Sequence, residues 1–265
     1  MIDLHCHLLP GIDDGAPDVE TSLEMARIAV DDGIEMIACT PHIYPGLYEN
    51  SGPDILRRVD ELQIILNDAG IPLTLTSGCD AHLTPTMVAE LKSGHIPTLA
   101  KSRYFLFEPP HHVAPPRLEE SVFATIAAGY MPIVTHPERL SWIESHYETM
   151  KTMARSGAWM QLTAGSITGR FGKRPQYWSE RMLDEGLVHI IATDAHNLRN
   201  RKPLMAEATR MVAERLGDDA ARDMVLTRPR MVLENADPAT GPMLVGAAPK
   251  PSGGLGALRR LFRAA

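Results

Sequence analysis

The sequence predicts an α/β fold whose parallel sheet is closed, or nearly closed, into a barrel. Seven short apolar runs have the length and the Gly, Pro or polar boundaries of buried strands, and amphipathic stretches lie between them. Strands that alternate with helices form parallel sheets with right-handed crossovers. The 265 residues of the chain also suit such a barrel, which typically needs about 250.

The expected strands, in chain order, are residues 2–7, 35–42, 72–80, 103–109, 131–138, 158–166 and 187–197. The helical stretch after the first strand reads DVETSLEMARIAVDDG. In it Asp18 can cap the N-terminus and Gly33 ends the element, while Leu23, Ala26 and Val30 share one face. The same alternation continues along the chain.

The end of the chain differs in composition from the rest. We expect residues 1–235 to form the barrel and residues 236–265 to be a flexible Pro/Gly/Ala-rich tail with a basic amphipathic end, ALRRLFRAA. A short helix there could make weak contact with an anionic membrane surface. A disordered end is the preferred alternative, because isolated helices under about 12–15 residues are marginal in water.

Composition narrows the classes of partner and compartment. The net charge of −7 offers no basic patch for a phosphate backbone, so we expect no nucleic-acid partner. Three cysteines make no disulfide framework, which suits a reducing cytoplasm. Met1 leads directly into the first motif without room for a cleaved signal, and no apolar run approaches the roughly 20 residues of a membrane span. We therefore expect a cytoplasmic protein.

Metal-competent side chains recur at the ends of the expected strands. His5 and His7 are two residues apart, so on a strand both point to one face while Cys6 points to the other. Six of the seven expected strands end in His, Asp or Glu, and barrel enzymes place their active sites at that rim. The strand-end residues are His5, His7, His42, Asp80, Glu108, His136, Glu138, Asp194 and His196.

These side chains predict a site with more than one metal ion. Each alone is explained by a capping or solvated turn role, which we prefer for Glu138, but their recurrence at one rim is not. Mixed imidazole and carboxylate ligands suit Mn, Fe or Zn. Their number exceeds the needs of one ion, so two or three ions roughly 3.5–4 Å apart, with bridging carboxylates, are expected.

The motifs DLHCH, IDDG, CTPH, FEP, HPER and TDAHN, in this order and spacing, resemble those of the polymerase and histidinol phosphatase (PHP) superfamily. Within it the chain is most similar to the bacterial capsular-polysaccharide tyrosine phosphatases, as IPTLAKSRY, THPER, LVHIIATDAHN and MAEA indicate. The resemblance implies a distorted (β/α)7 barrel with three divalent ions, Mn first, with Fe and Zn as alternatives. It also implies hydrolysis of phosphotyrosine on an autophosphorylating tyrosine kinase that controls exopolysaccharide export, and it leaves a homo-oligomer open.

The resemblance also implies a role for individual residues. Arg139 and Arg201 match the phosphate-binding arginines of the family, and a planar guanidinium suits phosphate oxygens. Asp13 is then a turn residue, or one that orients a ligand histidine. The implied metal groups are His5, His7, Asp80 and Asp194 for the first ion, Asp80, Glu108 and His136 for the second, and Asp14, His42 and His196 for the third.

One position departs from the family pattern. The bridging carboxylate is usually Glu, whereas this chain has Asp80, which is shorter by one carbon–carbon bond of roughly 1.5 Å. A closer backbone, an intervening water or a weakly bound metal are the alternatives. His82 could compensate, although a plain Asp80 bridge is preferred.

The chemistry expected of such a site needs few protein groups. Phosphoryl transfer leaves the ions and the two arginines mainly to position the group and neutralise its oxygens. A tyrosine leaving group, with a pKa of about 10, needs no dedicated general acid. The proline-rich stretch EPPHHVAPP, with His111 and His112, could overhang the site and contact a peptide; otherwise surface or hydrogen-bonded roles are expected for both.

Several rival functions remain open or are excluded. A cysteine phosphatase needs an arginine six residues after the cysteine, but Ile12, Pro45 and Pro85 stand there, so we expect the cysteines to be small buried residues. No strand end carries the lysine expected of an amidohydrolase. Hydrolysis of small phosphomonoesters such as histidinol phosphate, and a metal-poor regulatory scaffold, remain alternatives.

Overall fold

Seven runs of extended chain form the strands of the structure, and two of them are interrupted. The computed structural model describes residues 1–246, so the amphipathic end of the expected tail lies outside it. The strands within the described residues are β1 (Ile2–Cys6), β2 (Met36–Cys39), β3 (His42–Ile43), β4 (Thr74–Ser77), β5 (Asp80–His82), β6 (Tyr104–Glu108), β7 (Met131–Thr135), β8 (Trp159–Thr163) and β9 (Ile190–Ala192).

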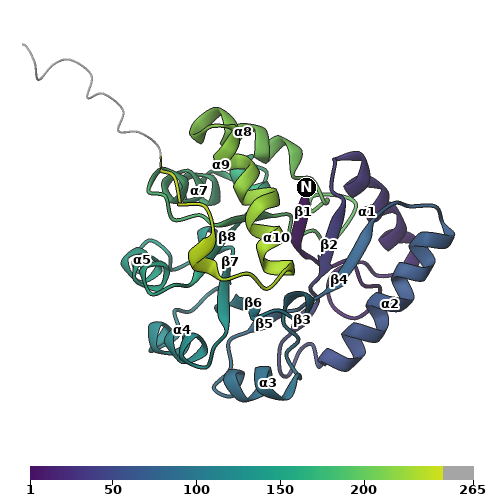
Figure 1. Ribbon diagram of the computed structural model, residues 1–265, viewed down its shortest axis with the longest axis horizontal. Coiled ribbons are helices and arrows are strands. Elements are labelled where there is room, and N and C mark those ends of the chain that lie inside the picture. The colour runs from purple at the N-terminus through teal and green to yellow at the C-terminus, as the bar shows by residue number, and fades with distance from the viewer. Residues whose placement is uncertain (247–265) are drawn as a thin grey trace, which may run out of the picture.

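Helices surround these strands, as Figure 1 shows. They are α1 (Val19–Asp31), α2 (Gly52–Asp68), α3 (Met87–Ser93), α4 (Leu118–Ala127), α5 (Tyr147–Arg155), α6 (Ala164–Ile167), α7 (Lys173–Asp184), α8 (Ala206–Leu216), α9 (Asp218–Arg222) and α10 (Arg228–Leu233). A π-helical turn at Asp223–Thr227 joins the last two, and short 3-10 turns occupy Leu99–Lys101, Pro137–Arg139 and Pro238–Thr240. Among the described residues, no helix is long and apolar enough to cross a membrane.

Every strand pair is parallel, which confirms the predicted α/β fold. One sheet has the order β1-β2-β4, and the other has the order β3-β5-β6-β7-β8-β9. The expected strands 35–42 and 72–80 each contribute to both sheets, because each is broken in the middle. A parallel bridge between Cys6 and Ala195 joins β1 to the segment after β9.

The first helix follows its predicted signals. The side chain of Asp18 accepts a hydrogen bond from the backbone N–H of Thr21 at 2.8 Å, and Gly33 turns the chain out of the helix with φ +88°. Ala26 is buried, whereas Leu23 and Val30 are only partly buried. The buried face of the helix is therefore shifted by about one residue from the expected stripe. It consists of Ser22, Met25, Ala26 and Ala29.

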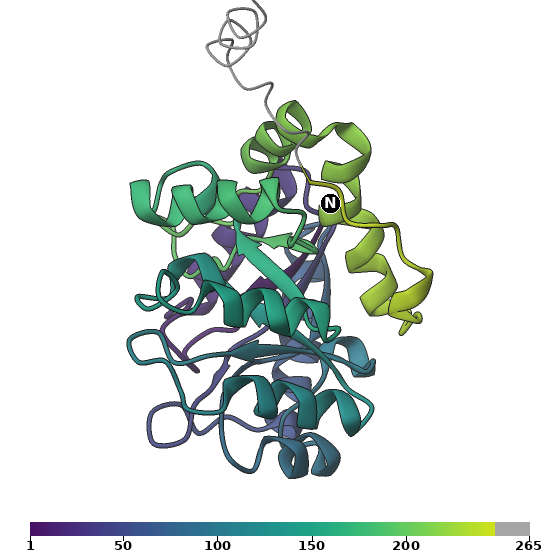
Figure 2. The ribbon, with the colours of Figure 1, turned by 90° about the vertical axis from the view of Figure 1, so that its left-hand side faces the viewer.

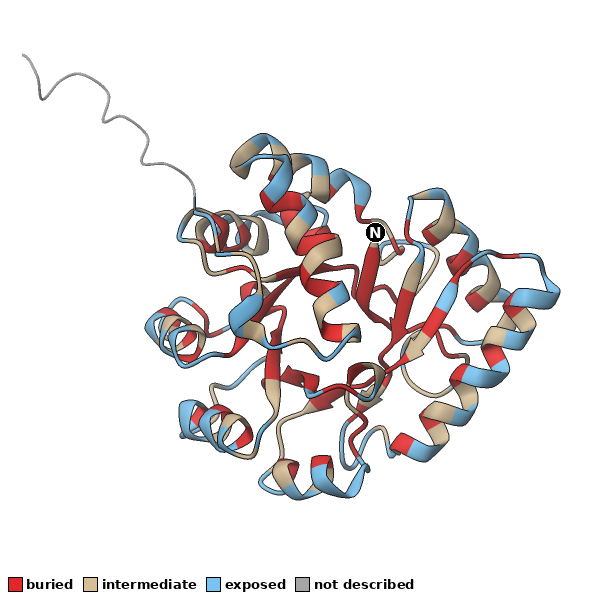
Figure 3. Cartoon of the chain, viewed as in Figure 1, coloured by how far each residue is buried: buried red, intermediate tan, exposed pale blue. Residues whose placement is uncertain are grey.

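Most strand residues are buried and the helices turn their outer faces to solvent, as Figure 3 shows. In β4 the burial is incomplete. One cluster of apolar side chains packs the helices against the strands. A second, smaller cluster contains Ile2, Tyr104, Trp159 and Ile190, which start or lie in β1, β6, β8 and β9. Val232 of α10 belongs to this cluster, so α10 covers the N-terminal ends of the strands. Figure 2 shows α10 on one side of the strands.

The described start of the expected tail runs along the barrel. Tyr104 donates a hydrogen bond from its hydroxyl to the carbonyl of Ala236 at 2.9 Å. Arg228, which is buried, donates to the carbonyls of Pro242 and Met243 at 3.1 and 3.3 Å. The covered end of the barrel thus includes residues beyond 235, and the opposite end carries the metal-competent side chains.

Candidate metal centre

His5 and His7 reach the site from β1 and the residue after its end. Both are fully buried, and their Nε2 atoms are 3.2 Å apart. The register of β1 against β2 shifts between Asp3 and Cys6, an irregularity of the kind that re-aims side chains. Cys6 belongs to the apolar cluster that packs the helices against the strands. It points away from the two histidines, as its alternation with them on a strand predicts.

Each of these histidines uses its other ring nitrogen to contact the protein. His5 Nδ1 lies 2.8 Å from Oε1 of Gln161 on β8, and His7 Nδ1 lies 2.7 Å from Oδ2 of Asp13. If both Nδ1 atoms donate, both Nε2 lone pairs face the site. The contact of Asp13 with His7 is the one that the expected orienting role requires. Gln161 did not emerge from the sequence.

The tight turn after β1 shapes this end of the site. Asp13 also accepts hydrogen bonds from the backbone N–H groups of Gly15 and His42, at 2.9 and 3.0 Å. The backbone N–H of Ala16 donates to the carbonyl of His7 at 3.1 Å. A Cβ on Gly15 would lie 2.3 Å from that carbonyl oxygen, so the turn has room only for glycine.

The four residues expected at the first ion lie together. Oδ2 of Asp80 lies 3.3 Å from Nε2 of His5. Oδ1 of Asp194 lies 3.4 Å from Nε2 of His5 and 3.5 Å from Nε2 of His7. All four side chains are buried.

The residues expected at the second ion adjoin this group. Oδ2 of Asp80 lies 3.7 Å from Nε2 of His136, and Oε1 of Glu108 lies 3.9 Å from the same nitrogen. His111 adds a further ring nitrogen near Glu108 and His136, and its ring centroid is 4.9 Å from that of His136. The proline-rich stretch EPPHHVAPP therefore approaches the site, as it must if it overhangs the site and contacts a peptide.

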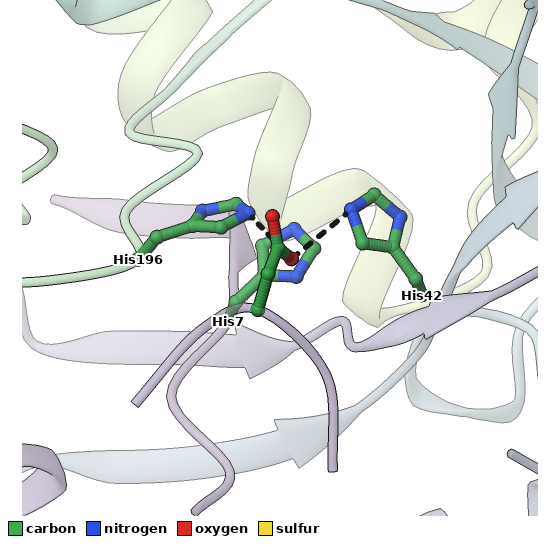
Figure 4. A group of neighbouring side chains, drawn as sticks. His7, His42 and His196 are labelled. Atoms are coloured by element: carbon green, nitrogen blue, oxygen red, sulfur yellow. Dashed lines mark ion pairs between the residues drawn. The ribbon is translucent and has the colours of Figure 1, made fainter. Parts of the chain in front are cut away.

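The residues expected at the third ion form another group. Oδ1 of Asp14 lies 3.6 Å from Nε2 of His42 and 3.3 Å from Nε2 of His196. Figure 4 shows the rings of His7, His42 and His196 turned toward one carboxylate. His7 belongs to this group by distance as well as to the first. Nδ1 of His42 lies 3.6 Å from Asp80, so the three groups are continuous.

The distances between the donor atoms are typical of ligands around a metal ion, and several of these atoms lack the hydrogen bonds expected of buried polar groups. Ligands bound at about 2.1 Å and separated by 90–110° lie roughly 3.0–3.5 Å apart, which is close to the separations found here. Buried polar atoms are normally hydrogen-bonded. Several donors in this cluster are buried without a hydrogen-bond partner in the described residues: both carboxylate oxygens of Asp80, Nδ1 of His42, Nδ1 of His136 and Nε2 of His196.

The local charges hold the carboxylates ionised. Burial raises the pKa of Asp80, but His5, His136 and His42 outweigh it and hold that pKa well below its usual range. Burial likewise opposes ionisation of Asp194, whose pKa is held well below its usual range by Arg201, His5 and Arg139. Ionised carboxylates gathered in this way are a favourable environment for a divalent cation.

The same balance acts on the imidazoles. Burial lowers the pKa of His5, but Asp80 and Asp194 outweigh it and raise it to about 9. For His42, Glu108 and Asp80 outweigh burial and raise the pKa to about 10. Burial, with His7 next to it, lowers the pKa of His196 to about 4. Protons therefore occupy His5 and His42 when no ion competes for them.

Two arginines border the cluster, as expected. Arg139 Nη1 and Arg201 Nη2 both donate to Oδ2 of Asp194, the latter at 2.6 Å. Nε of Arg201 is buried and has no hydrogen-bond partner among the described residues. Both arginines line one pocket of about 450 Å³, together with His111, Arg170, Phe171, Pro175 and Asn200. The Phe171 ring centroid lies 5.2 Å from Cζ of Arg139.

Backbone strain marks two of the candidate ligands. His136 and Asp194 have φ values of +35° and +51°, in the left-handed region that non-glycine residues seldom adopt. Such residues cost about 1–3 kcal/mol and cluster at functional sites. His136 follows the end of β7 and Asp194 follows the end of β9. At both places the chain turns sharply, and this turn directs the side chain toward the cluster.

The structure also places Glu138, His82 and the three cysteines. Glu138 is fully buried rather than solvated, because its carboxylate accepts a hydrogen bond from the backbone N–H of Thr163 at the start of α6. His82 lies 3.4 Å from Glu108 and stacks on Tyr44, with ring centroids 3.8 Å apart. All three cysteines are free and buried, as expected, and burial raises their thiol pKa values.

Comparisons with known proteins find chains of similar sequence. The model of the family described as "Capsular polysaccharide synthesis, CpsB/CapC" matches residues 1–234. Tyrosine-protein phosphatase YwqE of Bacillus subtilis (strain 168) is 34% identical over 237 residues, covering 89% of this chain and 90% of YwqE. Tyrosine-protein phosphatase CpsB of Streptococcus pneumoniae is 26% identical over 238 residues, covering 88% of this chain and 98% of CpsB.

Solved structures give the same relationship. A structure from work on YwqE of B. subtilis and CpsB of S. pneumoniae, described as unique metal-dependent tyrosine phosphatases, superposes with a TM-score of 0.87 at 30% identity. The superposition covers 94% of this chain and 100% of that one. Histidinol phosphate phosphatase of Lactococcus lactis shares the fold alone, with a TM-score of 0.54, 15% identity, and coverage of 85% of this chain and 95% of that one.

Proposed function

Because this chain belongs to the CpsB/CapC family of capsular polysaccharide synthesis, we propose that it is a metal-dependent protein-tyrosine phosphatase. It is a phosphoric monoester hydrolase. One observation carries the proposal: Arg139 and Arg201, from different segments of the chain, converge on Asp194 at the edge of a buried cluster of metal-competent side chains.

The proposed cofactor is a set of three divalent ions, with Mn as the first choice and Fe or Zn as alternatives. The short separations and the unpartnered buried donors support three adjoining sites. We assign the ligands as follows: His5, His7, Asp80 and Asp194; Asp80, Glu108 and His136; Asp14, His42 and His196. His111 and His7 are close enough to the second and third groups to add a ligand each.

Ions bound there would lower the pKa of a water toward 7 and so supply a nucleophile at neutral pH. The side chains of the protein position the phosphate group and the metal ligands. Arg139 and Arg201 place guanidinium N–H groups where they can donate to phosphate oxygens and neutralise their charge. Gln161 and Asp13 hold His5 and His7 in one ring orientation. A tyrosine leaving group needs little protonation to depart.

An aromatic ester suits the pocket beside the arginines. Phe171 lines it next to Arg139, so a phenyl ring attached to a bound phosphate would meet an aromatic side chain there. We propose that the substrate is phosphotyrosine on a tyrosine kinase that regulates capsular or exopolysaccharide synthesis, in line with the family description. The three free, buried cysteines support a reducing, cytoplasmic location.

The test compares three substrates with Mn-loaded protein: a phosphotyrosine peptide, the matched phosphoserine peptide, and histidinol phosphate. We expect kcat/KM to be highest for the phosphotyrosine peptide. His136→Ala should lower that kcat/KM roughly 100-fold or more, because it removes a ligand from the cluster.

Two outcomes oppose the proposal. Equal turnover of all three substrates would indicate a general phosphomonoesterase, and activity that survives His136→Ala would place the chemistry elsewhere. Circular dichroism and thermal melting of His136→Ala separate the loss of a ligand from the loss of the fold. Metal content, measured by elemental analysis, reports the number of ions directly.

A further inference from the structure

Positive charge gathers around the pocket that contains Arg139 and Arg201, although the chain as a whole carries a net charge of −7. Two of the segments that line this pocket are rich in cations. Residues 168–176 contribute Arg170, Phe171 and Pro175 to its lining, and residues 197–204 contribute Asn200 and Arg201. Neither segment contains an Asp or a Glu.

We define the basic rim as the other cations of these two segments. They are Arg170, Lys173, Arg174, Arg199 and Lys202. Arg170, Lys173, Arg174 and Arg199 are exposed, and Lys202 is half-buried. Lys173 and Arg174 occupy the first turn of α7, where the helix dipole disfavours positive charge.

The rim cations lack the carboxylate partners that several other surface arginines have. Arg57 pairs with Asp54 and Glu61, and Arg215 pairs with Asp184 and Glu180. Within residues 1–246 no rim cation forms an ion pair with an Asp or Glu. Arg170 donates to the hydroxyl of Thr168 at 3.1 Å, which leaves its charge uncompensated.

Arg174 has a different role from its neighbours. Its guanidinium donates to the carbonyls of Leu140 and Ser141, at 3.2 and 2.9 Å, directly after Arg139 in the chain. It ties the rim to the segment that carries the catalytic arginine. These two hydrogen bonds therefore fix the Arg174 end of the rim next to the segment that contains Arg139.

We propose that the basic rim binds acidic residues that flank the phosphotyrosine of a polypeptide substrate; this rests on the proposed function of the pocket. A polypeptide whose phosphorylated side chain enters the pocket must leave across one of its borders. Two of the segments that line the pocket, residues 168–176 and 197–204, are cationic. Asp, Glu or a second phosphorylated tyrosine on a polypeptide that leaves across either segment would be attracted. A peptide with neutral or basic flanks would gain nothing there.

A polypeptide fits this surface better than an anionic lipid bilayer does. The rim lies on two of the segments that line the pocket, and His111 and Arg139 of the same lining contact the candidate metal ligands His136 and Asp194. A flat bilayer would contact the rim without using the pocket. Phosphotyrosine side chains are long enough to reach inward while their flanking residues remain at the surface. The lipid alternative is included in the test.

The experiment measures binding separately from hydrolysis. Two labelled peptides carry a non-hydrolysable phosphonate analogue of phosphotyrosine, one with Asp and Glu flanks and one with Asn and Gln flanks. Their Kd values are compared by fluorescence anisotropy with the Mn-loaded protein. The rim variant is Arg170→Gln/Lys173→Gln/Arg199→Gln, which alters three exposed side chains and spares Arg174 and Arg201.

A matched variant removes the same charge from the rest of the molecule. Lys92→Gln/Arg155→Gln/Arg230→Gln alters three exposed cations on α3, α5 and α10 that form no ion pair within residues 1–246. We expect wild-type protein to bind the acidic peptide about tenfold more tightly than the neutral one, with the preference shrinking between about 0.02 M and about 0.5 M salt. The preference should disappear in the rim variant and persist in the matched variant.

Equal binding of the two peptides, or a preference that survives in the rim variant, overturns the proposal. So does rim-dependent binding to phosphatidylserine vesicles without any peptide preference, which would identify a lipid surface instead. Hydrolysis of the corresponding phosphotyrosine peptides is measured in parallel. Absence of hydrolysis with an intact binding preference would refute the proposed function but not the rim, and the reverse result would refute the rim alone.

Discussion

His5 and His7 each give one ring nitrogen to the protein and leave the other facing the site. The sequence could predict this pair, because two residues of spacing put both rings on one face of a strand. It could also suggest Asp13, which lies six residues after His7. It could not indicate Gln161, which meets His5 across 156 residues of chain and belongs to no recognisable motif.

Gln161 is predicted to be a positioning residue for the metal site. Gln161→Leu leaves Nδ1–H of buried His5 without an acceptor and frees the ring to change tautomer, so affinity for the metal should fall about 10–100-fold. Competition with a chromophoric chelator measures this affinity without any activity assay. Gln161→Glu keeps an acceptor for Nδ1 and serves as the control. A leucine variant that binds metal as tightly as the wild type would contradict the prediction.

The interrupted strands explain how the elements bring ligands together. The first strand breaks at Pro41, which has no N–H for the ladder. The second breaks next to Gly78, where an added Cβ would lie 2.6 Å from Cδ2 of Leu99. After the breaks, His42 of β3 and Asp80 of β5 are paired in register. This backbone placement brings Asp80 within 3.3 Å of Nε2 of His5. Periodicity alone predicted two continuous strands, because it records the spacing of apolar residues and not the effect of a proline or a glycine within a strand.

The turn between β1 and α1 is predicted to be as important as the ligands it carries. In Gly15→Ala the new Cβ would lie 2.3 Å from the carbonyl oxygen and 2.5 Å from Cβ of His7, so His7 must shift. We expect a loss of roughly 1–3 kcal/mol in the free energy of unfolding, together with weaker metal binding. Denaturant unfolding and the chelator competition measure the two effects.

Gly70→Ala is the matched control for this turn. Gly70 has φ +66° and no atom within 4 Å of an added Cβ, so only a backbone cost of about 1 kcal/mol is expected, with no change in metal affinity. Equal effects of the two substitutions on metal binding would show that the IDDG turn does not position His7.

At the scale of the whole molecule, the two ends of the barrel have separate tasks. Apolar residues at the starts of the strands pack under α10, while the ends of the strands converge on the metal-competent cluster. The sequence predicted the convergence of the strand-end side chains from one rule, that parallel strands end at a common edge. It could not predict that α10 covers the opposite end, nor that His111 reaches His136, because neither contact leaves a periodic pattern in the chain.

Metal removal should change how the stability of the whole fold depends on pH. In the metal-free protein the pKa values of His5 and His42 are about 9 and about 10, above the ordinary value of 6.5. A raised histidine pKa contributes stability that is complete below pH 6.5 and is lost as pH rises through the folded-state value. The Tm of the metal-free protein should therefore fall between pH about 6 and about 9.

Bound ions should reverse this trend, because they replace the protons on His5 and His42 and bind more tightly as competition from protons declines. Differential scanning fluorimetry of chelator-stripped and Mn-loaded protein at the two pH values measures the difference, under anaerobic conditions that keep Mn reduced. His42→Gln removes one of the two titrating rings, so the metal-free slope should become shallower. A metal-free protein whose Tm rises over this range would mean that the carboxylates do not hold protons on these imidazoles, and the cluster would then lack the negative potential needed to collect several divalent ions.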